Sequence, residues 1–426
     1  MNTVNQNNQK GLFYQFNIYH LVYFILWPFG ALVNSIKNFR NPGSKTLFWL
    51  FCIYFGFVFI FANPTLKGGA DSARYAKQLI SLHNNPVSWD QLVVMFYNSE
   101  DGYTDVYQPL VTWITSFFTD DPRWLFALFA FVFGYFYVQN LWIILSKTET
   151  KVGLVLFLFI LAFALVNPIW NINGVRMYTA AQVFLFGALQ YFMLNNKKGL
   201  LWCAASILIH FSFMFPVGLF LLYLLIPKSA HILFIFYFVT SFIKEINLVE
   251  IRNFLSFLPG VFQPKILAYT NEMYHETVQK QMANMAWHVI FARKAENWIL
   301  YSWVILIYFN FKDWLKNLPE IKNLFLFALF LGGWAQIASL VPSGVRFISV
   351  SHSLLYAVII LLIIQSNIKQ QFVLSKISVL PLLFVIIFQI RVGLDYVGIL
   401  TFAGNPFIAF FYEDQTPLIE FVKSIF

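Results

Sequence analysis

The sequence predicts an all-α polytopic membrane protein, and its composition and the spacing of its apolar runs both indicate that class. Hydrophobic residues make up 59% of the 426 residues and charged residues only 11%, which is about half the charge of an ordinary soluble domain. Apolar runs recur along the whole chain, and most approach the roughly 20 residues that a helix needs to cross a bilayer. No polar stretch is long enough for a separate soluble domain, so we expect a single transmembrane domain over residues 1–426.

The positions of the apolar runs predict about 10–11 transmembrane helices. Two long segments, 64–123 and 244–296, are expected as loops on the outer face. In the first, residues 109–118 are apolar but too few to span, which predicts a re-entrant or interfacial helix. An outer 244–296 loop requires one extra short crossing or a hairpin near 244–262. The expected spans are 16–33, 46–63, 124–145, 152–170, 175–194, 199–226, 297–311, 323–341, 345–365 and 377–394, with a short apolar run at 231–243.

The formal net charge of +9 is explained by topology rather than by a nucleic-acid partner. Lys and Arg lie mostly in short loops between spans, as the positive-inside rule expects of cytoplasmic loops. Phosphate-bearing lipids are a second interpretation of the basic charge. We therefore expect contact with membrane lipid and none with nucleic acid.

Three arginines depart from that rule because they fall on the expected outer face. Arg74 follows the second span, whereas Arg176 and Arg346 each stand at the outer start of an inward helix, after a glycine. Arginine near lipid is costly without a partner, and its planar fork suits phosphate. A helix N-terminus also favours an anion. Each arginine alone is equally explained by snorkelling or a structural ion pair. All three at one outer site favour a lipid pyrophosphate.

Acidic and histidine side chains supply the candidates for proton transfer. Asp71 stands three residues before Arg74, where the two make either an exposed ion pair or part of a site that binds or deprotonates an acceptor hydroxyl. A second acidic group, Glu100, Asp101 and Asp105, precedes the 109–118 segment. His210 lies within an apolar run, either as a hydrogen-bonded bundle histidine or as a catalytic or substrate-binding group.

Several chemistries lack their motifs in this sequence. There is no P-loop, no zinc-protease motif and no nucleophile elbow, so ATP-driven pumping is unsupported. Cys52 and Cys203 lie inside apolar runs and are expected as buried, unpaired thiols. We expect no cofactor and no metal.

The ordered motifs resemble the EpsG/Wzy-type exopolysaccharide and O-antigen polymerase family. The chain carries its Asp-x-x-Arg-Tyr signature at Asp71-Ser72-Ala73-Arg74-Tyr75. The other matching elements, in order, are Tyr107-Gln108-Pro109-Leu110, Asn173-Gly174-Val175-Arg176, His210-Phe211-Ser212 and Asn405-Pro406-Phe407.

The resemblance implies a GT-C-like membrane glycosyltransferase in the bacterial inner membrane, with its active site facing the periplasm or exterior. Such an enzyme joins undecaprenyl-pyrophosphate-linked oligosaccharide repeats for O-antigen, capsule or exopolysaccharide. A flippase and a chain-length regulator of the same pathway are expected partners. We expect Asp71, Arg176, His210 and Arg346 to be catalytic, with the arginines in place of a metal, and Arg74, Tyr75, Tyr107, Asn173 and Ser212 to bind substrate.

Other functions stay open at this point. A GT-C transferase that adds one sugar from a polyprenyl-phosphate donor also fits Asp71 in the first outer loop. A lipid-linked glycan flippase or transporter predicts internal repeats and charges lining both halves of the bundle. A membrane O-acyltransferase would rest mainly on His210.

Overall fold

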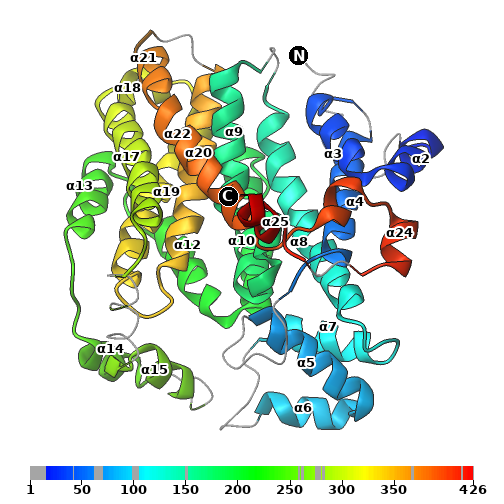
Figure 1. Cartoon of the computed structure of the whole chain (residues 1–426). Coiled ribbons are helices and arrows are strands. Elements are labelled where there is room, and N and C mark those ends of the chain that lie inside the picture. The colour runs from blue at the N-terminus through cyan, green and yellow to red at the C-terminus, as the bar shows by residue number, and fades with distance from the viewer. Residues whose placement is uncertain are drawn as a thin grey trace.

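Every regular element in the described part of the chain is a helix, which confirms the predicted all-α class (Figure 1). The computed structural model describes residues 16–41, 43–61, 71–97, 105–148, 152–257, 260, 263–273, 280, 284–365, 369–413 and 416–425. Four helical stretches there are long and apolar enough to cross a membrane: Pro122–Leu145, Leu154–Met193, Pro319–Ala338 and Arg346–Gln365. These stretches make the chain a membrane protein by length and composition.

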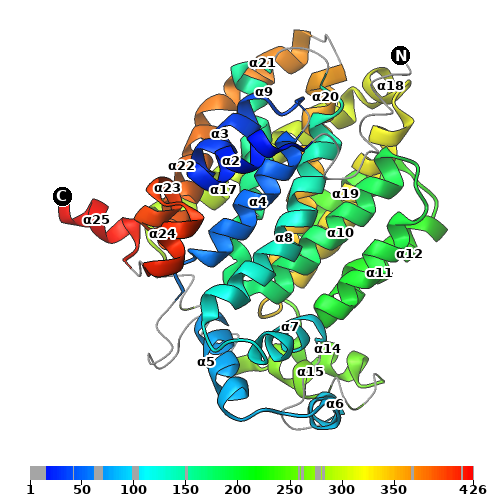
Figure 2. The same cartoon turned by 90° about the vertical axis from the view of Figure 1, so that its right-hand side faces the viewer.

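The body of the molecule is a bundle of helices of unequal length (Figures 1 and 2). It consists of α2 (Ile18–Leu26), α3 (Pro28–Lys37), α4 (Ser44–Phe57), α8 (Pro122–Leu145), α9 (Leu154–Val166), α10 (Val175–Met193), α11 (Gly199–Ile209), α12 (Met214–Leu225), α13 (Ala230–Ser241), α17 (Trp287–Phe309), α19 (Pro319–Ala338), α20 (Arg346–Gln365) and α22 (Val379–Gly393). Short elements join or flank them: η1 (Ile169–Gly174), η2 (Phe211–Phe213), α18 (Phe311–Leu315), α21 (Lys369–Ile377), α23 (Ile399–Ala403), α24 (Pro406–Phe411) and α25 (Leu418–Ile425).

Five short helices gather beyond one end of the bundle, at the bottom of both views (Figures 1 and 2). They are α5 (Asp71–Asn84), α6 (Trp89–Tyr97), α7 (Tyr107–Ser116), α14 (Leu248–Leu255) and α15 (Gln263–Tyr269). We call this the α5–α7 end. The two segments predicted to share the outer face therefore lie at the same end of the molecule.

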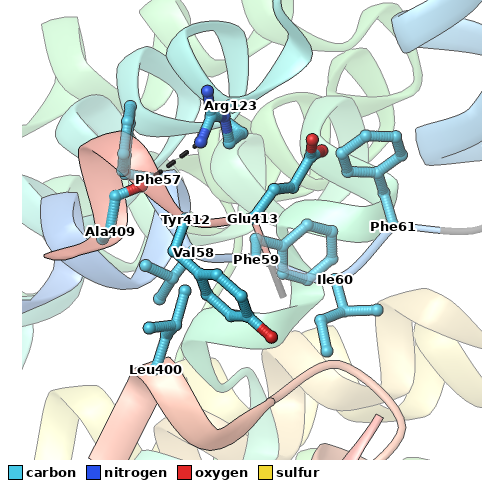
Figure 3. Close-up of a pocket in the computed structure, with 10 residues that line it drawn as sticks. All are labelled: Phe57, Val58, Phe59, Ile60, Phe61, Arg123, Leu400, Ala409, Tyr412 and Glu413. Atoms are coloured by element: carbon cyan, nitrogen blue, oxygen red, sulfur yellow. Dashed lines mark hydrogen bonds between the residues drawn. The ribbon is translucent and has the colours of Figure 1, made fainter. Parts of the chain in front are cut away.

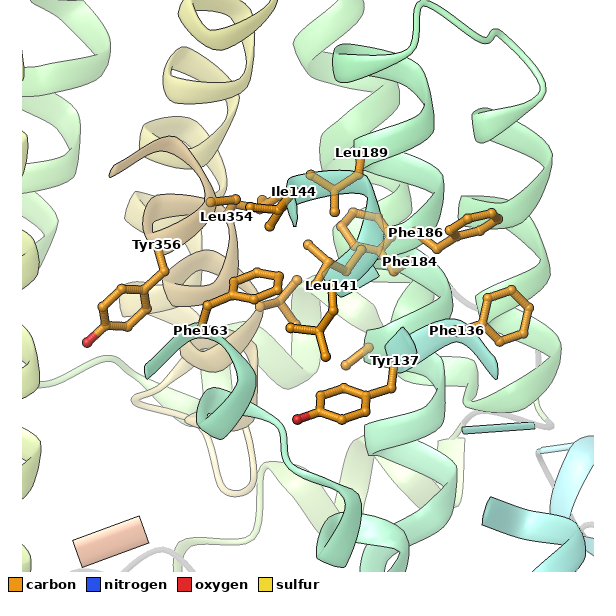
Figure 4. Close-up of a cluster of buried hydrophobic side chains, with 14 of the residues drawn as sticks. Phe136, Tyr137, Leu141, Ile144, Phe163, Phe184, Phe186, Leu189, Leu354 and Tyr356 are labelled. Atoms are coloured by element: carbon orange, nitrogen blue, oxygen red, sulfur yellow. The ribbon is translucent and has the colours of Figure 1, made fainter. Parts of the chain in front are cut away.

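The core forms where α8, α9, α10 and α20 meet, and it is dominated by aromatic and aliphatic side chains (Figure 4). Close helix packing depends on small residues in places. Gly187 of α10 and Gly199 of α11 face each other so closely that a Cβ on either would lie within 2.5 Å of the other's carbonyl oxygen. Both buried cysteines, Cys52 and Cys203, are unpaired as predicted. This packing fixes α10, whose first turn carries Arg176.

Two predicted spans are not continuous helices. The span at 16–33 is broken at Trp27, which has a non-helical backbone (φ −153°, ψ 86°), and α3 begins at Pro28. Proline is favoured in a first helical turn because it lacks a backbone N–H and cannot continue the preceding helix. The N-terminal apolar run therefore forms α2 and α3.

The span at 199–226 is instead a helical hairpin, because His210 has an extended backbone (φ −149°, ψ 116°) that ends α11. Val106, just before α7, bonds the Leu208 carbonyl, so α11 arrives at the α5–α7 end. At the far end of α12, the Tyr223 hydroxyl bonds the carbonyl of Asn323 in the first turns of α19. The extra crossing expected near 244–262 is thus made by α12, and α13 returns the chain to α14.

Candidate functional site

A buried carboxylate joins three segments that are far apart in the sequence. Asp105 Oδ2 accepts hydrogen bonds from Arg176 Nη1 at 3.0 Å and His210 Nδ1 at 2.9 Å. Its Oδ1 accepts from the backbone N–H of Phe211 at 2.8 Å. Arg176 Nε also reaches the Tyr75 hydroxyl, at 3.3 Å. We call Tyr75, Asp105, Arg176 and His210 the polar cluster.

Local structure explains why these side chains meet at the α5–α7 end. Arg176 is the second residue of α10, directly after the η1 turn, and His210 occupies the break between α11 and η2. Both helices end or begin at this end of the bundle. Asp105 directly precedes Val106, whose backbone bond to α11 holds the segment against the His210 break.

The polar cluster is electrostatically balanced. Burial by itself would raise the pKa of Asp105, but the hydrogen bond and charge of His210, the charge of Arg176 and the Phe211 N–H together hold that pKa below its usual value. Burial raises the pKa of Tyr75 to about 12, against the opposing charge of Arg176. Asp105 is therefore an anion and Tyr75 a neutral phenol at neutral pH.

A cavity of about 590 Å³ adjoins the polar cluster. Met177 and His210 belong to its wall, as do Ser212 of η2 and Arg346 at the start of α20. The rest of the wall comes from α12, α14, α15, α19, the 341–344 turn and α20 and is mainly apolar, with Phe254, Leu255, Ile266, Ile337 and Phe347 among the lining residues. The residues of α14 and α15 carry no recognisable motif, so their part in this wall was not predicted.

Several polar groups of the cavity wall have no protein partner within the described residues. The buried Ser212 hydroxyl and the buried indole N–H of Trp334 both lack a hydrogen bond there. The half-buried Arg346 guanidinium likewise has no ion pair or hydrogen bond in the part of the chain that the structure describes. An arginine against an apolar wall is costly without a counter-charge. The cavity therefore presents a cation that lacks a counter-charge, and so could bind an anion, beside an apolar space.

The other predicted site residues lie around the polar cluster rather than in it. Arg74 forms an ion pair with Asp71, and its side chain is 66% exposed, so the expected i,i+3 pair is present. Asn173 Nδ2 donates to the hydroxyl of Tyr396 at 3.2 Å. The Tyr107 hydroxyl is buried and has no hydrogen-bond partner among the described residues, and this burial raises the pKa of Tyr107. Glu100 and Asp101 lie outside the described residues.

A further arginine at this end, Arg123, was not singled out from the sequence (Figure 3). Its Nε donates to Asp121 Oδ2 at 2.8 Å, and its Nη1 donates to the carbonyl of Ala409 at 3.2 Å. The guanidinium also lies over the ring of Phe57, 5.2 Å from its centre. The adjoining crevice is only about 20 Å³, which is room for one water. The Asp-Pro-Arg sequence at the helix start is a capping signal that accounts for the local contact between Asp121 and the Arg123 backbone N–H.

No family model matches the chain, and comparisons with curated proteins and with solved structures also find no match. Within the described residues, no group of three or more His, Cys, Asp or Glu side chains is placed to hold a metal ion. The geometry of the site therefore stands as the main guide to function.

Proposed function

We propose that this chain is a polysaccharide polymerase that joins undecaprenyl-pyrophosphate-linked oligosaccharide repeats on the outer face of the bacterial inner membrane. Arg346 carries the proposal. It is half-buried on the wall of a largely apolar cavity and has no protein counter-charge in the described residues. An amphiphile with an apolar tail and an anionic head suits such a wall, and a polyprenyl pyrophosphate is one. The ordered motifs at Asp71, Arg176 and His210 support the same choice.

The reaction transfers the growing chain from its lipid pyrophosphate to a hydroxyl of a new repeat. The acceptor oxygen bonds to the anomeric carbon, the bond from that carbon to the pyrophosphate oxygen breaks, and the lipid pyrophosphate leaves with the electron pair. Arg346 and Arg176 stabilise the charge that develops on the leaving group. His210 or Asp71 receives the acceptor proton. Arginines supply the positive charge that a metal gives in other transferases, so we expect activity in EDTA.

The direct test is the length of the polymer in cells that carry Arg346→Ala or Arg346→Lys. We expect the alanine variant to lose the long-chain ladder on gels, and the lysine variant to shorten it, because a point charge lacks the bidentate fork. Arg391→Ala is the matched control, since Arg391 pairs with Asp395 at 3.0 Å and is 46% exposed. A wild-type ladder in Arg346→Ala, at normal protein level, contradicts the role of Arg346.

A GT-C transferase with a polyprenyl-monophosphate donor can be distinguished from the proposed polymerase by its product. That enzyme adds a single sugar, whereas the proposed polymerase yields a ladder of repeats. A flippase moves the lipid-linked glycan across the bilayer and forms no glycosidic bond. A ladder that persists in EDTA supports the polymerase.

A further inference from the structure

The carboxylate of Asp105 binds both His210 and Arg176. Asp105 is 1% exposed, and its Oδ2 accepts hydrogen bonds from His210 Nδ1 at 2.9 Å and from Arg176 Nη1 at 3.0 Å. Oδ1 is occupied by the Phe211 N–H. Because both oxygens are engaged by this chain, Asp105 has little capacity left for a ligand. Its contacts indicate that it acts through its neighbours.

The contact with Asp105 fixes the protonation pattern of the imidazole. A carboxylate accepts hydrogen bonds, so the ring nitrogen that faces it carries the proton. Nδ1–H of His210 therefore points to Asp105, and in the neutral ring Nε2 keeps its lone pair. His210 lines the cavity, and Nε2 is the nitrogen left for a group bound there.

We propose that Asp105 is the positioning residue of the site, which holds His210 as the proton acceptor and Arg176 as the adjacent cation in one unit. This inference rests on the proposed polymerase function and distinguishes His210 from Asp71 as the base. Asp71 is engaged by the exposed Arg74. In the reaction, Nε2 takes the acceptor proton while the new glycosidic bond forms, and Asp105 stabilises the resulting imidazolium.

The groups around His210 come from three other segments. Asp105 faces it from the segment before α7, Arg176 donates to the same carboxylate from α10, and the hydroxyl of Tyr75 in α5 bonds Arg176. Burial raises the pKa of Tyr75 to about 12, so its phenol is neutral at neutral pH. Of the four residues of the polar cluster, His210 is the one that lines the cavity.

The first test uses the wild-type protein, so it does not depend on a variant that folds. The full chain, labelled with ¹⁵N-histidine and held in lipid nanodiscs, is studied by NMR, and the His210 signal is assigned by its loss in His210→Gln. We expect the neutral ring to carry its proton on Nδ1. A proton on Nε2 overturns the proposal.

The second test removes the charge of Asp105 and measures turnover with lipid-linked repeats prepared from the same cells. Asp105→Asn is expected to lower kcat about 100-fold or more, with a smaller change in KM. Asp105→Glu should restore part of kcat. Asp90→Asn, which changes an exposed acid of α6, is the control.

Failure of the inference and failure of the proposed function give different results. A wild-type kcat in Asp105→Asn, while the wild-type protein makes polymer, overturns the positioning role. If the wild-type protein makes no polymer but His210 carries its proton on Nδ1 and loses that preference in Asp105→Asn, the positioning role holds and the polymerase proposal fails.

Discussion

Arg123 and Arg176 occupy equivalent places in two long helices, yet their surroundings differ. Each is the second residue of its helix, α8 and α10, at the α5–α7 end. Arg123 is bound by Asp121, two residues away, and by a carbonyl of α24, beside a crevice of about 20 Å³. Arg176 is bound by Asp105 and Tyr75 from distant segments, and Met177 beside it lines the cavity of about 590 Å³.

The different surroundings of Arg123 and Arg176 show that an arginine at a helix start is not by itself an anion site. Asp121 caps α8 and neutralises Arg123 locally, so this arginine attaches the C-terminal segment to α8. Arg176 has a counter-charge that it shares with His210, and the shared unit borders a space large enough for a ligand. The structural Arg123 and the proposed functional Arg176 therefore differ in their partners and in the size of the adjoining space, not in their position in the helix.

The largest expected effect comes from removing each arginine in turn. Arg176→Ala should abolish the long-chain ladder, a loss of about 100-fold or more in turnover. Arg123→Ala should keep the ladder and lower thermal stability, by about 1–2 kcal/mol for the lost charge-assisted hydrogen bonds. Gel ladders and thermal unfolding of the purified variants measure the two outcomes. Loss of the ladder in Arg123→Ala at normal protein level would remove the distinction between the two sites.

Filling the cavity should have the next largest effect. Ala338 lines it from α19, and Ala338→Phe places a ring in the space proposed for the lipid tail. We expect about a 10-fold loss of affinity for undecaprenyl pyrophosphate, about 1.4 kcal/mol, measured by protection against thermal unfolding. Leu221→Phe is the matched control, because Leu221 of α12 is 51% exposed. Unchanged affinity in Ala338→Phe contradicts this use of the cavity.

The polar cluster should also confer a pH-dependent stability. The pKa of Asp105 is lower in the folded protein than in the unfolded chain. Its ionisation therefore stabilises the fold above about pH 4, and this stabilisation is lost as the pH falls through the lower folded-state value. The stability difference between wild type and Asp105→Asn should shrink as the pH is lowered from 7 to 3. A constant difference across that range contradicts the lowered pKa.

Tyr75→Phe is expected to have the smallest effect. Its hydroxyl meets Arg176 at 3.3 Å, a long contact, and its ring still packs on Phe129. Loss of one such hydrogen bond costs about 1 kcal/mol, so turnover should fall only a few-fold. A loss as large as that of Arg176→Ala would assign Tyr75 a direct part in the reaction.

The sequence predicted features that depend on local pattern. Apolar runs predicted the helical class, the separate helices within 152–170 and 175–194, and a short helix near 109–118, which is α7. The i,i+3 spacing predicted the Asp71–Arg74 ion pair as one of two alternatives. These features need only neighbouring residues, whose periodicity and charge are visible in one sequence.

Features that depend on distant segments were not predictable in the same way. The break at His210 lies in a continuous apolar run without glycine or proline at that position, so 199–226 read as one span. Asp105 stood among three acids, and only its burial against α10 and η2 selects it. The cavity wall from α14 and α15 likewise depends on tertiary packing, which no local pattern records.

The central claim is tested most directly by reconstitution. The purified chain in proteoliposomes, with undecaprenyl-pyrophosphate-linked repeats and EDTA, is assayed for glycan length and for released undecaprenyl pyrophosphate. We expect a ladder with one lipid pyrophosphate released for each repeat joined, and its loss in Arg346→Ala. Transport of the lipid-linked glycan across the bilayer with no new glycosidic bond would contradict it.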